Sequence, residues 1–431
     1  MLTDGLRLAP HVSRAVILGE VHARPFTALA TPSRVLHFAF ETTGERSSSD
    51  RAALIAFCKA QGLVPPQPDE KHFRTPVQNM VLRWEQHSEF TTYTWEIPAK
   101  STGRAFHPSP SDLARPMSLV PQPGPLLVAI DLHLLSDQAD EISLEGLFDR
   151  ASIAVAENAD RTALYATDYK VDPAGFVRIL IIDRGLDLEL AGALVQRILE
   201  LETYRTLALL GLPEAQRLAP SIARIEARLV DITRDMRFAE SLVANHHLLN
   251  ELTALAADLE AGAAASLFRF GASRAYNEIV QLRLQTIGEN KVGGLPTWSA
   301  FLARRMNPAM RTCLTTEERQ ASLSEKLART ANLLRTRVDV ARQQQNQDLL
   351  ESMNAGAQLQ LRLQATVEGL SVAAISYYVV GLFGYIVKGL HDASLVKVEP
   401  TYAMAIFTPI AVVTIWWVVS RIRRKHFAAV K

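Results

Sequence analysis

Two short stretches of this chain place acidic, basic and imidazole side chains at every second position. The first reads Glu-Val-His-Ala-Arg-Pro-Phe, and its polar residues are Glu20, His22 and Arg24. Residues two apart in an extended chain point to the same face, so these side chains can reach one ligand. A carboxylate, an imidazole and a guanidinium together can bind an anion or position a general acid and base. The alternative is a structural ion pair at the end of a strand that stops before Pro25.

The second stretch carries Arg83, Glu85, His87 and Glu89 with the same spacing. Glutamate and imidazole ligands in this order can bind a divalent cation. Thr91, Tyr93 and Trp95 extend the same face if no turn intervenes. Alternating polar and apolar residues are also typical of any half-exposed strand. Neither stretch specifies a reaction, so the catalytic residues stay unknown and we expect no metal site and no cofactor.

Other sequence features narrow the function classes. The chain lacks a Walker-type phosphate loop, His-Glu-x-x-His, Gly-x-Ser-x-Gly and paired Cys-x-x-Cys motifs. A net charge of +1 argues against a nucleic-acid-binding domain. Cys58 and Cys313 are far apart and without metal-ligand spacing, which favours a reducing compartment. For the arginines around Phe268, ion pairs on a helix surface are the default; lipid headgroup or nucleotide phosphate binding is the alternative (Arg269, Arg274 and Arg283).

The first third of the chain reads as a mixture of strands and one helix. β-rich or apolar runs bounded by turn residues predict strands at 14–20, 34–41, 80–97 (two strands), 126–135, 163–169 and 176–182. The stretch Asp172-Pro-Ala-Gly175 predicts a hairpin turn between the last two. Residues 51–61 predict a short helix.

From Asp187 onward the pattern becomes helical. Asp187 is expected to cap a helix that ends at Gly211-Leu-Pro213, and further breaks are expected at Gly271 and residues 288–296. A short helix is expected at 298–306, ending before Pro308. A helix from about 316 to 388 would then be roughly 100 Å long.

An imperfect apolar seam follows this long helix: Leu323, Leu327, Leu334, Val338, Ala341, Leu349, Met353, Leu363 and Val367. It is typical of a stalk packed on other helices or of an oligomeric coiled coil with polar layers. An intramolecular bundle with residues 214–284 fits the same pattern.

Two uncharged apolar segments, Gly369 to Val387 and Pro400 to Ser420, are long enough to cross a bilayer as helices. They predict a transmembrane hairpin; a buried helical hairpin in a soluble domain is the alternative. Small residues and phenols mark a membrane packing face on the first: Tyr377, Tyr378, Gly381, Gly384 and Tyr385. Neither segment contains an ionisable Asp, Glu, Lys, Arg or His, so we do not expect an ion-coupled transporter.

Flanking charges predict the orientation. Basic residues follow the second segment, at Arg421, Arg423, Arg424 and Lys425, whereas the loop 388–399 mixes both signs. The positive-inside rule therefore places both termini in the cytoplasm. The first ten residues lack an apolar core and cleavage site, so no signal peptide is expected there.

Together these features predict an α+β fold with a mixed α/β N-terminal domain, a helical middle and a two-helix transmembrane hairpin. The expected divisions are 1–186 (cytoplasmic domain), 187–314 (helical), 315–368 (stalk or coiled coil), 369–390 (first span), 391–399 (extracytoplasmic loop), 400–421 (second span) and 422–431 (basic tail).

Several runs of sequence resemble an uncharacterised bacterial family of membrane-anchored proteins, known as a domain of unknown function. They are Glu20-Val-His-Ala-Arg-Pro-Phe26, Trp84-Glu-Gln-His-Ser-Glu-Phe-Thr-Thr-Tyr93, Glu200-Leu-Glu-Thr-Tyr-Arg-Thr-Leu-Ala-Leu-Leu210, Phe268-Arg-Phe-Gly-Ala-Ser-Arg-Ala-Tyr276, Arg311-Thr-Cys313, Leu334-Arg-Thr-Arg337 and Thr366-Val-Glu-Gly-Leu-Ser-Val-Ala-Ala-Ile-Ser-Tyr-Tyr378. The resemblance spans nearly the whole chain. It implies a bacterial inner-membrane anchor and a cytoplasmic body, and it supplies no activity, cofactor or catalytic residue.

A weaker, architectural likeness is to the magnesium-channel superfamily, which marks the end of its first span with Gly-Met-Asn. Here that place reads Lys388-Gly-Leu-His-Asp392, so the filter is missing. Three functions remain open. The first is a non-enzymatic anchored protein that binds a partner or organises an assembly; the second is a channel-like oligomer. The third is a tethered enzyme using the two polar faces. Expected partners are the lipid bilayer, an unknown protein and a second copy bound through stalk and spans; nucleic acid is not expected.

Overall fold

The computed structural model describes residues 11–14, 17–18, 26–68, 70–99, 105–106, 116, 118–119, 122–137, 144–393, 395 and 397–428. These residues form two compact units. The first comprises Met1–Asp235 and Glu251–Thr330, and the second comprises Met236–Asn250 and Ala331–Lys431. The fold class is α+β, as predicted.

The described strands of the first unit form one nine-stranded sheet, ordered β2-β3-β4-β1-β5-β8-β7-β6-β9. Their bounds are β1 Ser33–Glu41, β2 His72–Val77, β3 Met80–Gln86, β4 Phe90–Pro98, β5 Leu126–Ser136, β6 Ala154–Glu157, β7 Ala163–Val171, β8 Val177–Asp183 and β9 Asn290–Lys291. Neighbouring strands are antiparallel except for β5 and β8, which are parallel. Short turns join four of the neighbouring pairs, β2–β3, β3–β4, β6–β7 and β7–β8, whereas the parallel pair of β5 and β8 needs a longer crossover.

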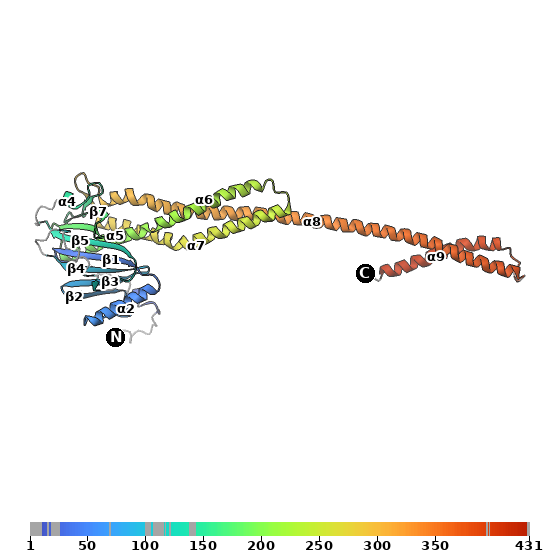
Figure 1. Ribbon diagram of the computed structural model, residues 1–431, viewed down its shortest axis with the longest axis horizontal. Coiled ribbons are helices and arrows are strands. Elements are labelled where there is room, and N and C mark those ends of the chain that lie inside the picture. Colours follow the sequence, from blue (N-terminus) through green and yellow to red (C-terminus); the bar gives the residue numbers. More distant parts are fainter. Residues whose placement is uncertain are drawn as a thin grey trace. The chain divides into compact units, whose positions relative to one another are not determined.

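Helix α5, Leu188–Leu209, lies against one face of the sheet (Figure 1). Asp187 caps it by accepting a hydrogen bond from the Leu190 backbone N–H at 2.7 Å, as predicted. Apolar residues of the strands, of α5, and of the facing ends of α7 and α8 form one core on this face. Because inward residues alternate along each strand, Ile130, Leu132 and Leu134 of β5 all enter this core.

Helix α2, Glu45–Ala60, covers part of the other face, where Leu54 and Phe57 pack on Trp84 and Trp95. The short helix α4, Leu144–Leu147, and its neighbours cover the β6–β8 side of the same face. The sheet is thus buried on both faces, which explains why most of its strands are apolar on both sides.

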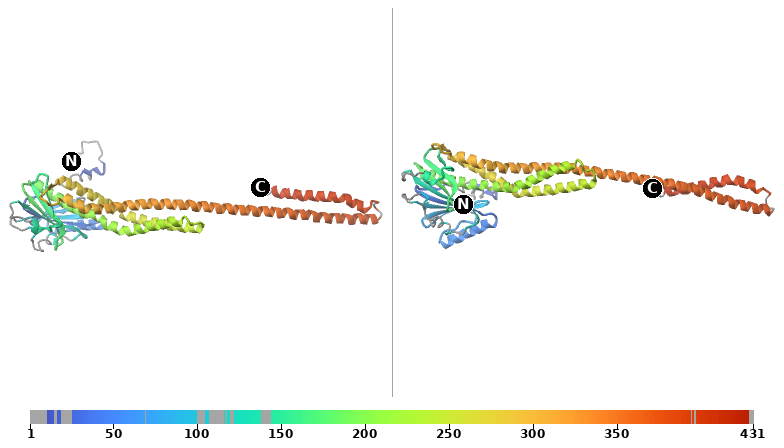
Figure 2. Two further views of the ribbon diagram at one scale, coloured as in Figure 1. Left: turned by 90° about the horizontal axis from the view of Figure 1, so that it is seen from above. Right: turned by 45° about the horizontal axis from the view of Figure 1, so that its top comes forward.

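Three helices continue the first unit beyond the sheet: α6 (Gly211–Asp235), α7 (Leu242–Ile287) and α8 (Trp298–Asp392), of which α7 and α8 also enter the second unit. Within the first unit they lie side by side (Figure 2). Their buried stripes include Ile225, Leu259 and Leu327, and Arg319 of α8 pairs with Glu226 of α6 at 2.7 Å. For this part of α8, the predicted intramolecular bundle is confirmed.

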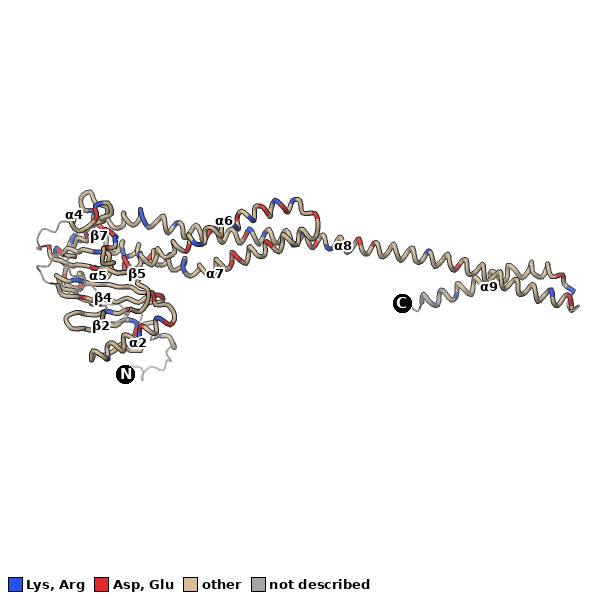
Figure 3. Tube along the Cα trace, viewed as in Figure 1, with Lys and Arg blue, Asp and Glu red and all other residues tan. Residues whose placement is uncertain are grey.

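In the second unit, α8 and α9 (Pro400–Ala428) form an antiparallel pair (Figure 1). The rings of Phe383 and Phe407 stack with centroids 3.8 Å apart, and a Cβ on Gly384 would meet the Met404 side chain. Both helices are long and apolar enough to cross a membrane. Figure 3 shows how few Lys, Arg, Asp and Glu residues this part contains.

Three local predictions were wrong. Helix α8 continues through Pro308, and α7 continues through Gly271. Buried residues on both sides, such as Met306 and Cys313 around Pro308, hold the helix despite the lost backbone donor. In the predicted strand at 14–20, the described residues Arg14, Ile17 and Leu18 are helical instead.

Candidate functional site

Of the two predicted polar faces, the structure describes only the second. Glu20, His22 and Arg24 lie outside the described residues, so their arrangement stays a prediction. The second face is divided by a tight turn, because β3 ends at Gln86 and β4 begins at Phe90. Because a turn intervenes, the condition for a continuation through Thr91, Tyr93 and Trp95 is not met: the two aromatic rings enter the core on the α2 face. Of the four polar residues predicted to share this face, only Arg83 and Glu85 lie together on the strand face towards α5.

Arg83 starts a chain of hydrogen bonds that crosses three elements. Its guanidinium donates to Gln196 Oε1 of α5 at 3.1 Å, and the Gln196 amide donates to Glu200 at 3.0 Å. Glu200 also accepts from Arg283 of α7 at 2.5 Å. A cation lies at each end and a carboxylate near the middle, so the chain connects β3, α5 and α7 without exposing a reactive group.

Glu85 lies beside His72 of β2, with 3.5 Å between the carboxylate and Nδ1, and accepts from Thr92 at 3.4 Å. Burial alone would raise the pKa of Glu85. The His72 contact and the nearby charges of Arg83 and His87 outweigh it, and the pKa is lowered. The carboxylate is therefore ionised at neutral pH and unsuited to act as a general acid.

His37 of β1, which the sequence patterns did not single out, lies in the same polar layer. Its Nε2 is 3.0 Å from Thr203 Oγ1, whose own hydroxyl donates to the Leu199 carbonyl. Nε2 must therefore carry the proton, and Nδ1 accepts from Thr94 Oγ1 at 2.8 Å. Complete burial, reinforced by Arg83, lowers the pKa of His37 to about 3. A neutral imidazole with both nitrogens bonded is a structural element of the layer.

Glu89 and His87 sit apart from that layer, in the turn between β3 and β4. Glu89 is 3% exposed and accepts from Arg269 of α7 at 2.7 Å. The His87 ring stacks on Phe90 at 4.1 Å. The expected default for the arginines is confirmed: Arg269, Arg274 and Arg283 pair with Glu89, Glu317 and Glu200.

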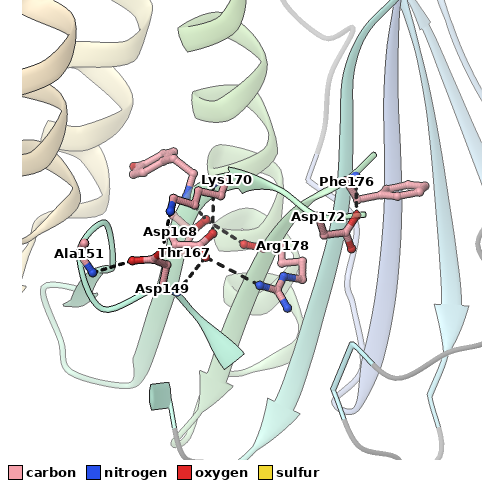
Figure 4. Close-up of polar contacts among 9 residues, drawn as sticks. Asp149, Ala151, Thr167, Asp168, Lys170, Asp172, Phe176 and Arg178 are labelled. Carbon is pink, nitrogen blue, oxygen red and sulfur yellow. Dashed lines mark hydrogen bonds and ion pairs between the residues drawn. The ribbon is translucent and has the colours of Figure 1, made fainter. Parts of the chain in front are cut away.

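A second polar group, which the sequence patterns also missed, lies where β7 bulges beside β8 (Figure 4). Asp168 is buried and accepts from the backbone N–H groups of Asp149 and Lys170, at 3.0 and 3.1 Å. The Lys170 ammonium in turn donates to Asp149 at 2.5 Å and holds the pKa of that carboxyl below its usual value. Arg178 approaches Asp168 at 3.8 Å. Asp168 thus holds two backbone N–H groups in place, and Lys170 and Asp149 neutralise each other.

Next to this bulge, a cavity of about 360 Å³ opens between β5, β7 and α5. Tyr169 lines it with a φ of 55°, a strained conformation for a tyrosine. Arg205 lies over the Tyr169 ring at 5.2 Å and is held by Glu202, which is 1% exposed. Among the described lining residues Arg205 is the cation, and Glu202 already neutralises it, so this lining offers an apolar pocket rather than an anion site.

Across the described residues, no group of three or more His, Cys, Asp or Glu side chains could hold a metal ion. In the hairpin, Tyr377, Tyr378 and Tyr385 are strongly exposed, whereas Gly384 packs against α9. The five residues predicted as one packing face therefore divide between two faces of α8.

Comparison with curated proteins and with solved structures found no match to this chain. A family model described as "Protein of unknown function (DUF3422)" matches residues 9–426. That range takes in the sheet, the helices and both apolar segments, so the chain is a member of this family over nearly its whole length.

Proposed function

We propose that this chain is a membrane-anchored protein whose body binds a partner protein and performs no catalysis. The exposed apolar surface of α8 and α9 carries the proposal. Only 17% and 6% of the residues in their apolar stretches are buried. A contiguous apolar surface of this kind is unfavourable in water, and a bilayer covers it at no such cost.

The pairing of the two helices supports the same conclusion. Phe383 stacks on Phe407, so a residue before Phe383 lies level with the residue that follows Phe407 by the same number of positions. Residue 369 is then level with 421, and 390 with 400. The first uncharged segment, 369–387, is therefore level with 403–421, nearly the whole of the second, as two spans of one bilayer must be.

The flanking charges support the proposed orientation. Arg421 and the basic residues after it support a cytoplasmic end for α9 in a bacterial inner membrane, and a two-span hairpin would return the body to the same side. The loop between the spans then faces the extracytoplasmic side.

The polar groups of the body favour binding over catalysis. Arg83, Glu85, Glu89 and Asp168 each have an internal partner, and neutral His37 is bonded at both nitrogens. A general base needs a pKa near neutrality and access to substrate. His37 and Glu85 have pKa values shifted away from that range and are buried or nearly so.

A cleft of about 620 Å³ in the first unit, the body of the protein, is the candidate surface for binding a partner protein. Leu210, Pro213 and Phe268 give it an apolar lining, with Arg217 and Arg269 among its charged residues. Phe268 is 62% exposed and lies under the Arg269 guanidinium at 5.6 Å. An exposed aromatic ring beside an arginine is the composition of interface hot spots.

Membrane insertion and orientation can be tested on the full-length protein. We expect it to remain in the membrane pellet after alkaline carbonate washing. In intact cells, an impermeant maleimide should label Ala393→Cys, in the loop, and should label Ala428→Cys only after the membrane is permeabilised. Release by carbonate, or labelling of Ala428→Cys from outside, contradicts the proposal.

Partner binding can be tested by crosslinking in membranes followed by affinity capture of the intact chain. Phe268→Ala should reduce the captured partner at least several-fold, because hot-spot truncation costs about 2 kcal/mol or more. Phe238→Ala, at a ring that is also strongly exposed (77%), is the matched control and should change little. If capture yields no reproducible protein, or both variants behave alike, the binding surface is not this cleft.

A further inference from the structure

Helix α8 carries a row of exposed apolar side chains just before its membrane segment. Eight large ones are between 52% and 73% exposed: Leu349, Leu350, Met353, Leu359, Leu361, Leu363, Val367 and Leu370. Since they precede residue 371, at most the last lies within the expected hydrocarbon region. Lipid therefore does not cover this row, and water contact with so many leucines is unfavourable.

The row has the spacing of a coiled-coil seam. Positions 349, 353, 356, 360, 363, 367 and 370 are separated by alternating steps of four and three residues. Five of the seven are large and apolar; Gly356 and Gln360 are the exceptions. Leu350 and Leu359 flank the seam at the neighbouring e and g positions, and only Leu361 lies elsewhere.

The charges of this segment avoid the seam. Between residues 348 and 370 the charged residues are Asp348, Glu351, Arg362 and Glu368. If 349, 356, 363 and 370 are the d positions and 353, 360 and 367 the a positions, these four charged residues occupy the outer positions c, f, c and b. A second identical helix packed in parallel therefore meets no like charge across the seam, whereas a charge at a or d would face its own copy.

The same face continues into the membrane segment. At 100° per residue, the seam leads to Ala374, Tyr377, Tyr378, Gly381 and Tyr385. The three tyrosines are 70–80% exposed, whereas α9 contacts α8 at Phe383 and Gly384. Two of these phenols lie midway between residues 369 and 390, where hydrocarbon offers no hydrogen bond. Small residues beside them allow another helix to come close.

We propose that a second copy of this chain packs in parallel on this face of α8, from Leu349 to Tyr385. This inference rests on the proposed membrane anchoring. Insertion in one bilayer holds two copies parallel and at the same height, so each seam residue meets its own counterpart. The tyrosine hydroxyls then lie next to polar groups of the neighbouring copy, and the α9 helices remain on the outside.

Cysteine crosslinking of the full-length chain in membranes tests the register. Leu363→Cys and Val367→Cys lie on the seam, while Gln358→Cys and Arg362→Cys lie on the opposite side of the same helical turns. A disulfide needs Cα atoms roughly 4.4–6.8 Å apart, so a mild oxidant should produce at least about tenfold more covalent dimer from the seam variants. The wild-type chain, whose two cysteines are buried, gives the background.

Equal yields from the four variants, or no dimer above background, overturn the inference. A crosslink from the seam positions to a different protein overturns it as well, because the occupant is then not a second copy. Carbonate washing of the same membranes separates the two proposals. A chain that stays in the pellet without seam crosslinks loses only the pairing, and a chain that is released loses the anchoring too.

Discussion

At the scale of single residues, several polar side chains between the sheet and α5 are held by side chains of other elements. His37 shows this best, since each of its ring nitrogens bonds a threonine hydroxyl and burial lowers the pKa of the ring. Arg83 and Glu85 belong to the same polar layer, and both contact side chains from other elements. Such a layer fixes how α5 lies on the sheet, because each donor has one acceptor position to reach.

The His37 environment predicts acid sensitivity. The pKa falls from an ordinary 6.5 in the unfolded chain to about 3 in the folded chain, so between these values the unfolded state binds more protons. Stability therefore rises with pH in this window and is lost on acidification. From pH 7.5 to 5.0 the loss is on the order of 2 kcal/mol, at about 1.36 kcal/mol per unit.

Urea unfolding of the detergent-solubilised chain at the two pH values measures this loss. His37→Gln cannot titrate and should show a clearly smaller difference than the wild type. The exposed His246→Gln should behave like the wild type. The same pH dependence in all three proteins would falsify the assignment to His37.

Two arginines of α7 form ion pairs that differ in burial, so together they measure how burial changes what an ion pair contributes to the free energy of unfolding. Arg269 binds Glu89, whose side chain is 4% exposed, while Arg274 binds Glu317, which is 31% exposed. Arg269→Met leaves a buried carboxylate unpaired and should cost about 2–4 kcal/mol. Arg274→Met removes a solvated pair and should cost less than about 1 kcal/mol. Chemical denaturation gives both numbers, and similar costs would contradict the burial argument.

At the scale of elements, the docking of α5 depends on one close backbone approach. A Cβ added to Gly192 would lie 1.8 Å from the Thr27 carbonyl oxygen, which is backbone and cannot rotate away. The same segment is held by a hydrogen bond from Leu29 N–H to the Leu188 carbonyl at 2.9 Å. The start of α5 therefore tolerates no side chain at this position.

Two glycines within helices test this point. Gly192→Ala should destabilise the protein by roughly 1–3 kcal/mol or more, because the backbones must separate. In Gly262→Ala of α7 the nearest atom to the new methyl is Leu218 Cδ2 at 3.4 Å. Here the gain in helix propensity, up to about 1 kcal/mol, should offset the contact. Thermal unfolding of the two variants should differ in sign or by several degrees; equal shifts would show that Thr27 moves freely.

The elements themselves could largely be predicted from the sequence. The strand β1, the β3–β4 pair and the capped start of α5 follow from short-range patterns that their own residues encode. Pro308 and Gly271 misled the prediction because packing on both sides outweighed a local preference. The period-two pattern through residue 95 failed because it does not reveal the turn at His87.

The partners within the site could not be predicted in the same way. Arg83 binds Gln196 and Glu89 binds Arg269 across more than 100 residues of sequence. These pairs depend on which helix docks on which strand and at what height, and no local spacing contains that information. His37 was missed for a related reason, since it occurs in a run of apolar strand residues and looks like one of them.

At the scale of the whole molecule, the described chain divides into a body unit and a unit that holds both apolar helices, and one family model covers them together. Anchoring and pairing are proposals for the second unit. Partner binding is a proposal for the first, since Phe268 and the cleft around it belong to that unit.

The order of these parts along the chain has a consequence for synthesis. The core on the α5 face takes its last buried residue from Met306, whereas the first uncharged segment begins only at 369. At about 5–20 residues per second, a ribosome needs roughly 3–12 s to add the residues between them. Every segment of the sheet's core is therefore synthesised before the first apolar segment. The first unit can fold while the hairpin has not yet been translated.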